Sequence, residues 1–186
     1  MKTIAEKQIL MAADFAGVGL KDAVKAHLER NGWTVTDIGV QAGQTHPEMF
    51  HRIGFAVGAK IAEGEFEKAI IFCGTGMGIH IAAGKCPGVQ AACVESPHAA
   101  LRAVTGNNCN VLAMGGMWIG QELGIEMVDA FLNHKIGDGY EDVDNWVEFH
   151  MVAYNEIRDF DYAKYKANGF RIDHEPDPVL GQFPRP

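Results

Sequence analysis

The sequence predicts an α/β fold in which a mostly parallel sheet lies between two layers of helices, followed by a C-terminal helix and an extended tail. Two observations predict this fold. Short, uniformly apolar runs of strand length, such as AIIFC at 69–73, alternate along the chain with amphipathic segments of helical period. Strands that have no polar side belong in a parallel sheet that is covered on both faces.

The expected elements follow one another in βα order, separated by glycines and polar turns. Strands are expected at 8–13, 33–39, 69–73, 90–94 and 110–114. Helices are expected at 20–31, where apolar residues recur at every fourth position, and at 53–63, 120–132 and 146–166.

The end of the chain has a different composition. Four of the seven prolines stand in 169–186, which therefore cannot continue a helix or join a central strand. We expect an extended tail that lies on a neighbouring surface. The chain is thus predicted to comprise one domain over 1–150 and a C-terminal helical extension with a Pro-rich tail over 151–186.

Composition and charge exclude several classes of partner. The chain has 186 residues, of which 47% are hydrophobic, and a formal net charge of -8. Negative charge repels polyanions, so nucleic acid is not an expected partner. No apolar stretch approaches the roughly 20 residues that span a bilayer, and the N-terminus does not resemble a signal peptide. We therefore expect no membrane partner and a cytoplasmic location. The four cysteines form no CxxC pair, so we expect them to remain free thiols.

The run CGTGMG at 73–78 follows the third strand, at the edge where parallel sheets bind ligands. Its alternate glycines allow a tight turn that exposes backbone N–H groups to an oxyanion. The same donors can make Cys73 a thiolate base or nucleophile. The glycine spacing also fits nucleotide-binding loops and plain strand-to-helix turns, and the cysteine also fits a buried small hydrophobe.

The run CGTGMGIHIAAGKCPGVQAACVESPHAA, at 73–100, closely resembles the core motif of the ribose-5-phosphate isomerase B and galactose-6-phosphate isomerase family. The segments ADFAGVGLKDAVKAHLERNGWTVTDIG, at 13–39, and NNCNVLAMGG, at 107–116, occur in the same order at similar spacing. The resemblance implies a Rossmann-like three-layer αβα domain that forms a homodimer or higher homo-oligomer. It also implies an active site at the subunit boundary, a small-molecule sugar substrate, and neither a metal nor an organic cofactor.

The resemblance implies that Cys73 takes a proton from the carbon next to the sugar carbonyl. The resulting enediolate is then reprotonated on the neighbouring carbon. The hydroxyl of Thr75 would orient the thiolate, while loop N–H groups would hold the enediolate oxygen. Asp14 matches a residue that binds sugar hydroxyls. The expected site comprises the catalytic Cys73 and Thr75 and the substrate-binding Asp14, Phe15, His46, Gly74, Gly76, Met77, Gly78, His80 and Asn107.

The sequence departs from the family pattern where ring opening and phosphate binding are concerned. Phe15 replaces a histidine, and Gly106 stands where a ring-opening histidine precedes the asparagine. Met117 and the acidic stretch at 138–142 occupy positions of phosphate-binding arginines. New histidines at 46 and 80 are expected to face the pocket, although a lone histidine is as often a surface or core residue. Histidine spacing gives no metal site.

These departures favour a non-phosphorylated, open-chain substrate, because a phosphate dianion requires cationic donors. The 4-deoxy-5-hexosulose-uronate ketol-isomerase branch would fit, and the carboxylate of a keto-uronate could be held by Arg102, Lys85, Arg171 or a histidine. The alternatives are a pentose or hexose phosphate isomerase, a non-catalytic partner subunit of such an enzyme, and a nucleotide-binding protein. Against nucleotide binding, the glycine loop of this sequence lacks a Gly-Lys-Ser/Thr ending, and no acidic residue stands where it would anchor a ribose.

Overall fold

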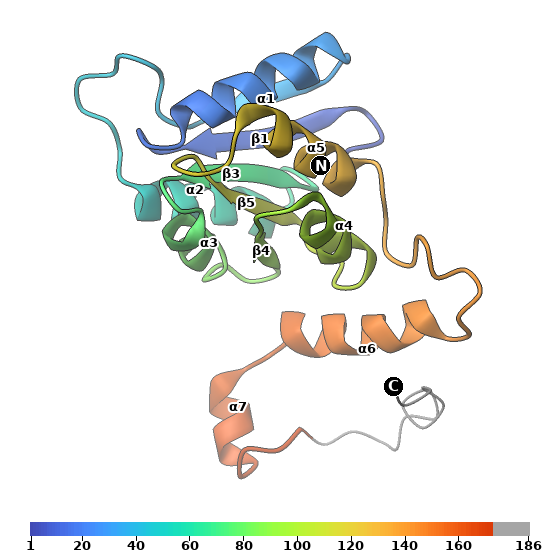
Figure 1. Ribbon diagram of the computed structural model, residues 1–186. Coiled ribbons are helices and arrows are strands. Elements are labelled where there is room, and N and C mark those ends of the chain that lie inside the picture. Colours follow the sequence, from blue (N-terminus) through green and yellow to red (C-terminus); the bar gives the residue numbers. More distant parts are fainter. Residues whose placement is uncertain (173–186) are drawn as a thin grey trace.

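Five parallel strands form one sheet in the computed structural model, which describes residues 1–172 (Figure 1). The strands lie in the order β2-β1-β3-β5-β4. Because every strand points the same way, their carboxyl ends share one edge of the sheet. The strands are β1 (Gln8–Ala13), β2 (Thr34–Asp37), β3 (Ala69–Cys73), β4 (Ala91–Cys93) and β5 (Val111–Gly115).

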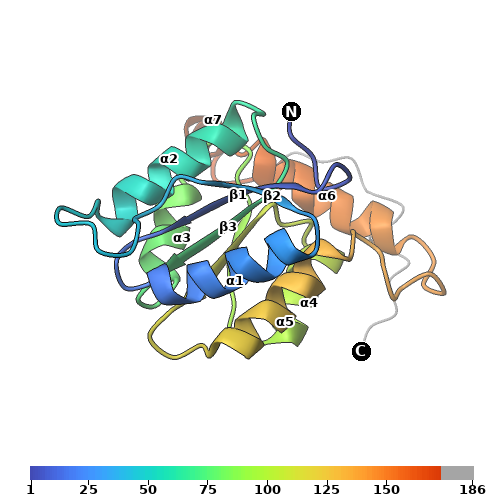
Figure 2. The same cartoon turned by 90° about the horizontal axis from the view of Figure 1, so that it is seen from above.

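Helices cover both faces of the sheet, as Figure 2 shows. The helices α1 (Val18–Arg30), α4 (Pro97–Thr105) and α5 (Gln121–Leu132) pack on one face. The opposite face is covered by α2 (Phe50–Ala62) and α3 (Met77–Ala83). In β1 the side chains of Ile9 and Met11 enter one apolar cluster, and Leu10 enters the other. The strand is therefore apolar throughout, because neither of its sides meets water.

This arrangement confirms the predicted α/β sandwich. The predicted strands occur, although β2 and β4 are shorter than expected. The α1 helix begins two residues before the expected start at 20, after the turn at Gly17. In the described part of the chain, no helix combines the length and the apolar character that crossing a membrane requires.

The C-terminal part of the described chain extends beyond the sandwich (Figure 1) and contains no buried helical residue. It contacts the sandwich at its surface, where Gln90 Nε2 donates to the Tyr154 carbonyl oxygen at 3.1 Å. The single helix expected over 146–166 is instead two helices, α6 (Trp146–Arg158) and α7 (Tyr162–Ala167). Asp161 separates them, because its carboxylate caps α7 by accepting the Lys164 N–H. The boundary predicted at residue 150 falls inside α6. The four prolines of the expected tail lie outside the described residues.

Candidate active site

Cys73 ends β3 at the carboxyl edge of the sheet, with only 3% of its surface exposed. Its Sγ accepts the Gly76 N–H at 3.1 Å, so the loop folds back onto the sulfur. Gly76 has a φ of 78°, which favours glycine, and a Cβ added there would lie 2.8 Å from the Met114 carbonyl carbon. The loop therefore places a backbone donor where negative charge on sulfur would be stabilised.

Asp14 follows β1, the strand next to β3, and is 4% exposed. Its Oδ1 accepts the N–H groups of Ala16 and Gly17 at 2.9 and 3.0 Å. Burial raises the pKa of Asp14, and these two hydrogen bonds oppose the rise. Gly17 packs against β3, since a Cβ added there would lie 2.7 Å from Phe72 Cβ. The Asp14 turn and the Cys73 loop are thus close neighbours.

The hydroxyl of Thr75 has a local partner in the described structure. Its Oγ1 accepts the Met77 N–H at 3.2 Å, and the donor at Cys73 Sγ is the Gly76 N–H. No hydrogen bond joins the Thr75 hydroxyl to Cys73 Sγ among residues 1–172. A role for Thr75 in orienting the thiolate remains a prediction.

Cys93, at the end of β4, is a residue of this edge that sequence reasoning missed. Its thiol lies 3.8 Å from the Thr75 carbonyl oxygen and donates to it. Burial, with smaller contributions from Cys73 and Glu95, raises the pKa of Cys93 and keeps it a thiol. The available signal was its position, because the end of β4 shares an edge with the end of β3.

Exposed apolar side chains belong to the turns that follow β1, β3 and β5 at this edge of the sheet. Phe15 and Met77, both predicted site residues, are 69% and 50% exposed, and Met117 and Trp118 are 68% and 50% exposed. Met117 lies over Gly74, where an added Cβ would be 2.9 Å from its Cε. Gly78 is similarly close to the Phe50 ring. Exposed apolar groups gathered in one place mark a surface that binds a ligand or another protein.

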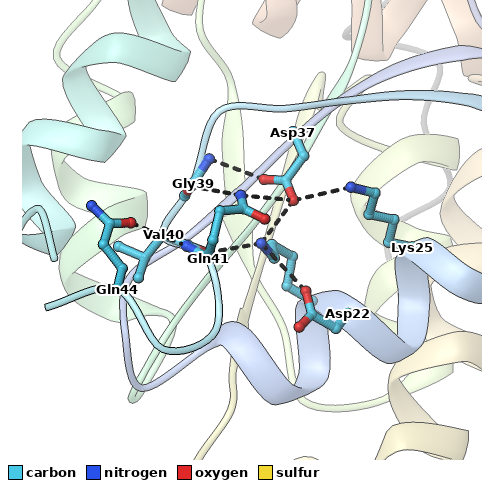
Figure 3. Close-up of polar contacts among 8 residues, drawn as sticks. Asp22, Lys25, Asp37, Gly39, Val40, Gln41 and Gln44 are labelled. Carbon is cyan, nitrogen blue, oxygen red and sulfur yellow. Dashed lines mark hydrogen bonds and ion pairs between the residues drawn. The ribbon is translucent and has the colours of Figure 1, made fainter.

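A buried ion pair fixes the loop after β2 beside Asp14. Lys21 Nζ, fully buried, lies 2.7 Å from Asp37 Oδ2 and 2.8 Å from the Val40 carbonyl oxygen. Figure 3 shows the further contacts of Asp37 with Lys25 and Gly39. Burial acts to raise the pKa of Asp37, but the hydrogen bonds and charge of Lys21 and the Gly39 N–H together lower it.

The Val40 N–H also donates to the Ala13 carbonyl oxygen at 2.8 Å, so the start of this loop is attached to the end of β1. His46 lies further along the same loop and is exposed. His80, on α3, has its Nε2 3.2 Å from the Ala91 carbonyl oxygen at the start of β4. That contact occupies one ring nitrogen of His80. Substrate contact by either histidine remains a prediction.

Asn107 lies at the opposite edge of the sheet from Cys73. It follows α4 and precedes β5, is exposed, and donates from Nδ2 to the Arg102 carbonyl oxygen at 3.4 Å. The five residues of β5 span roughly 17 Å between the two edges. One chain therefore brings Cys73, Asp14 and the glycine loop together, but not Asn107.

Within residues 1–172, no group of three or more His, Cys, Asp or Glu side chains is arranged to hold a metal ion. The chemistry at the carboxyl edge consists of a buried thiol, a buried carboxyl group and backbone donors. This set can move protons and hydrogen-bond hydroxyl groups.

The fold and this site define an α/β protein with proton-transfer groups at the carboxyl edge of its sheet, and comparison with known proteins identifies it as a sugar isomerase and gives the family. The chain belongs to the Ribose/Galactose Isomerase family, whose model matches residues 9–145. It is 42% identical, over 135 residues, to the 4-deoxy-4-sulfo-D-erythrose isomerase of Clostridium sp. (strain MSTE9), covering 73% of this chain and 84% of that protein. The resemblance drawn from the loop motif is thereby confirmed.

Two further relatives act on phosphorylated sugars according to their names. The chain is 33% identical to the D-erythrulose-4-phosphate isomerase of Pectobacterium atrosepticum, covering 70% of this chain and 86% of that protein. It is 36% identical to ribose-5-phosphate isomerase B of Escherichia coli K12, covering 72% of this chain and 88% of that protein. A solved ribose 5-phosphate isomerase from Thermotoga maritima superposes with a TM-score of 0.71 at 31% identity, covering 82% of this chain and 98% of that one.

Proposed function

We propose that the chain is a ketol isomerase in which Cys73 carries the proton between two adjacent carbons of an open-chain sugar. The observation that carries this proposal is the buried Cys73 sulfur, held by the Gly76 N–H at the carboxyl edge of the sheet. The thiolate takes the proton from the carbon next to the carbonyl. The bonding electrons become the enediolate double bond, and the carbonyl oxygen acquires negative charge, which loop N–H groups stabilise. Return of the proton to the neighbouring carbon completes the isomerisation.

Asp14 binds substrate hydroxyls in this scheme. Its Oδ1 is occupied by two backbone donors, whereas its Oδ2 accepts no hydrogen bond from the described residues. Because Asp14 retains 4% of its surface exposed, this oxygen can accept a hydrogen bond from a sugar hydroxyl at the edge of the sheet. Proton movement between the two sugar oxygens completes the balance of the reaction.

A second copy of the chain completes the proposed site. Asn107 reaches substrate at Cys73 only when it comes from another copy, because the two residues occupy opposite edges of one sheet. A two-fold symmetric dimer would form two such sites, each with Cys73 from one copy and Asn107 from the other. The exposed apolar groups around Cys73 would then be covered.

The proposed substrate is a short open-chain sugar with an anionic end group. Gly106 supplies no side chain for opening a ring, which suits a substrate that has none. A four-carbon sugar whose C4 oxygen is replaced by sulfonate, or carries phosphate, has no hydroxyl with which to close a five-membered ring. Relatives at 42% and 33% identity carry the names of such substrates. We therefore place 4-deoxy-4-sulfo-D-erythrose first, with the carboxylate-bearing keto-uronate as the second candidate.

The direct test incubates the purified chain in deuterated water and follows product and deuterium incorporation by proton NMR. The substrates are 4-deoxy-4-sulfo-D-erythrose, a 4-deoxy-5-keto uronate, D-erythrulose 4-phosphate and ribose 5-phosphate. We expect turnover of the sulfonate, loss of it in Cys73→Ser, and retention in Cys86→Ser, which alters a thiol next to the Phe55 carbonyl oxygen. Turnover of ribose 5-phosphate alone would contradict the open-chain substrate. Absence of turnover with all four substrates would favour a non-catalytic partner subunit.

A further inference from the structure

Arg102 is held in place by two aromatic rings. Its Cζ lies 4.3 Å from the centroid of the Tyr140 ring and 5.6 Å from that of the Trp146 ring. The two rings are themselves stacked, with centroids 3.7 Å apart and planes 4° from parallel. Three segments thus meet here, since Arg102 belongs to α4, Tyr140 to the connection after α5, and Trp146 to the first turn of α6. A guanidinium that rests on ring faces keeps its planar donors in a fixed orientation.

The Arg102 guanidinium pairs with no carboxylate among residues 1–172. Several other cationic side chains in this range do have such partners, among them Lys21 with Asp37, Arg52 with Glu48, Lys60 with Glu65 and Arg158 with Asp159. Two of the nearest acidic residues in sequence to Tyr140 are engaged locally. Asp138 accepts the Lys135 N–H at 2.9 Å, and Glu141 accepts the Gly139 N–H at 3.0 Å. An oriented guanidinium without an acidic partner in the described structure is prepared to bind an anion.

This arginine lies at the edge of the sheet that carries Asn107. The Arg102 carbonyl oxygen accepts from Asn107 Nδ2 at 3.4 Å and from the Gly106 N–H at 3.1 Å. A Cβ added to Gly106 would lie 3.9 Å from His150 Nε2. The His150 ring in turn lies 4.1 Å from Trp146 and bonds through Nδ1 to the Trp146 carbonyl oxygen. The helix α6 therefore closes against the turn that holds Asn107.

We infer that Arg102, supported by Tyr140 and Trp146, binds the anionic end group of the substrate whose reacting carbons lie at Cys73 of a second copy. The inference rests on the proposed function and identifies the cation that the proposed substrate requires. One guanidinium next to the acidic stretch at 138–142 suits a singly charged sulfonate or carboxylate. A phosphate dianion would meet more repulsion there.

The test compares three substrates in Arg102→Met, with Arg30→Met as the control. Arg30 is an exposed arginine at the end of α1 and has no ion pair in the described structure. D-Erythrulose is an uncharged open-chain ketose, D-erythrulose 4-phosphate carries a dianion, and 4-deoxy-4-sulfo-D-erythrose carries a monoanion. We expect Arg102→Met to lower kcat/KM for the sulfonate by about 10- to 100-fold, mainly through KM. D-Erythrulose should be turned over at the wild-type rate by both variants.

Arg102→Lys distinguishes a binding role from a structural one. It keeps the positive charge but loses the planar fork, so kcat/KM for the sulfonate should recover only in part. A merely structural arginine would affect charged and uncharged substrates equally. An equal loss on D-erythrulose and on the sulfonate would therefore overturn the inference.

A heterodimer tests whether Arg102 acts on the other copy's site. Cys73→Ser and Arg102→Met chains are co-expressed with different tags, and the mixed dimer is purified through both tags. One of its two sites would contain an intact Cys73 and an intact Arg102, which predicts about half of the wild-type activity at low sulfonate concentration. Activity no higher than that of Arg102→Met alone would contradict action across the interface.

The inference and the proposed function fail in different ways. A wild-type chain that isomerises none of the three four-carbon sugars would refute the proposed substrate class. A wild-type chain that isomerises the sulfonate, with Arg102→Met equal to Arg30→Met, would refute the role of Arg102 and leave the isomerase intact.

Discussion

Cys73 and Asn107 lie at opposite edges of one parallel sheet, because Cys73 ends β3 and Asn107 precedes β5. If both contact one substrate molecule, two copies must meet across that site. We therefore predict that isomerase activity per chain falls on dilution, in parallel with dissociation of the dimer. Sedimentation velocity and initial rates measured over the same concentration series will check this. Full activity in a fraction shown to be monomeric would refute the shared site.

The ion pair of Lys21 and Asp37 should be the most sensitive polar contact near the site. Both side chains are almost completely buried, at 0% and 4% exposure, so Asp37→Asn removes the buried counter-charge of Lys21 and leaves its ammonium group only the half-exposed Asp22. We expect a loss of about 3–5 kcal/mol in the free energy of unfolding. Asp22→Asn removes a carboxylate 3.3 Å from the same Lys21 but 48% exposed, and should cost at most about 1 kcal/mol. Urea unfolding of both variants gives the comparison.

The same pair predicts a pH dependence. The pKa of Asp37 is lower in the folded protein, since its bonds to Lys21 and Gly39 outweigh the opposing effect of burial. A lowered carboxyl pKa stabilises the fold above the ordinary value near 4, and this stabilisation is lost as pH falls through the folded pKa. Wild-type stability should therefore drop more steeply below about pH 4 than that of Asp37→Asn. If the unfolding free energies of the two proteins changed in parallel with pH, this contribution of Asp37 would be excluded.

Gly76 should be irreplaceable for two separate reasons. Its φ of 78° strains any L-residue, and an added Cβ would lie 2.8 Å from the Met114 carbonyl carbon. Gly88 has a similar φ of 71° but open space around it, so Gly88→Ala measures the backbone strain alone, about 1–2 kcal/mol. Gly76→Ala should cost more than Gly88→Ala in unfolding free energy. It should also abolish isomerisation, because the N–H that meets Cys73 Sγ must move. Equal costs would show that the loop shifts freely.

The sequence was sufficient for the features that depend on local pattern. The strand at 69–73 is apolar at every position, and the loop that follows it carries the motif, so Cys73 could be placed at the carboxyl edge. The position of Asn107 also follows from the βα order, since a residue that precedes a parallel strand lies at the opposite edge of the sheet from a residue that follows such a strand. The boundaries of short elements such as β4 were less well defined, because three residues carry little periodicity.

Features that depend on distant residues could not be predicted. Lys21 stands next to the apolar stripe of α1, and its burial depends on Asp37, which is 16 positions away on β2. The support of Arg102 requires rings from two later segments, and no local pattern links them. The break between α6 and α7 arises from the capping carboxylate of Asp161 inside a stretch whose apolar spacing continues.

Asp14 offers a test that separates function from stability. Burial raises the pKa of its carboxyl group in the folded protein, so keeping it ionised costs folding free energy as pH rises above the ordinary value near 4. In Asp14→Asn the amide oxygen can still accept from Ala16 and Gly17, and no buried charge remains. We therefore expect unchanged or slightly higher stability at pH 7.

Activity should change in the opposite direction. An amide group in place of the Asp14 carboxylate loses a charge-assisted hydrogen bond to a substrate hydroxyl, which predicts a fall in kcat/KM of about 10- to 100-fold. Urea unfolding and initial rates on the same preparation will measure both effects. If stability and activity fell together, Asp14 would act in folding and not in binding the sugar. Unchanged activity in a stable variant would remove Asp14 from the proposed site.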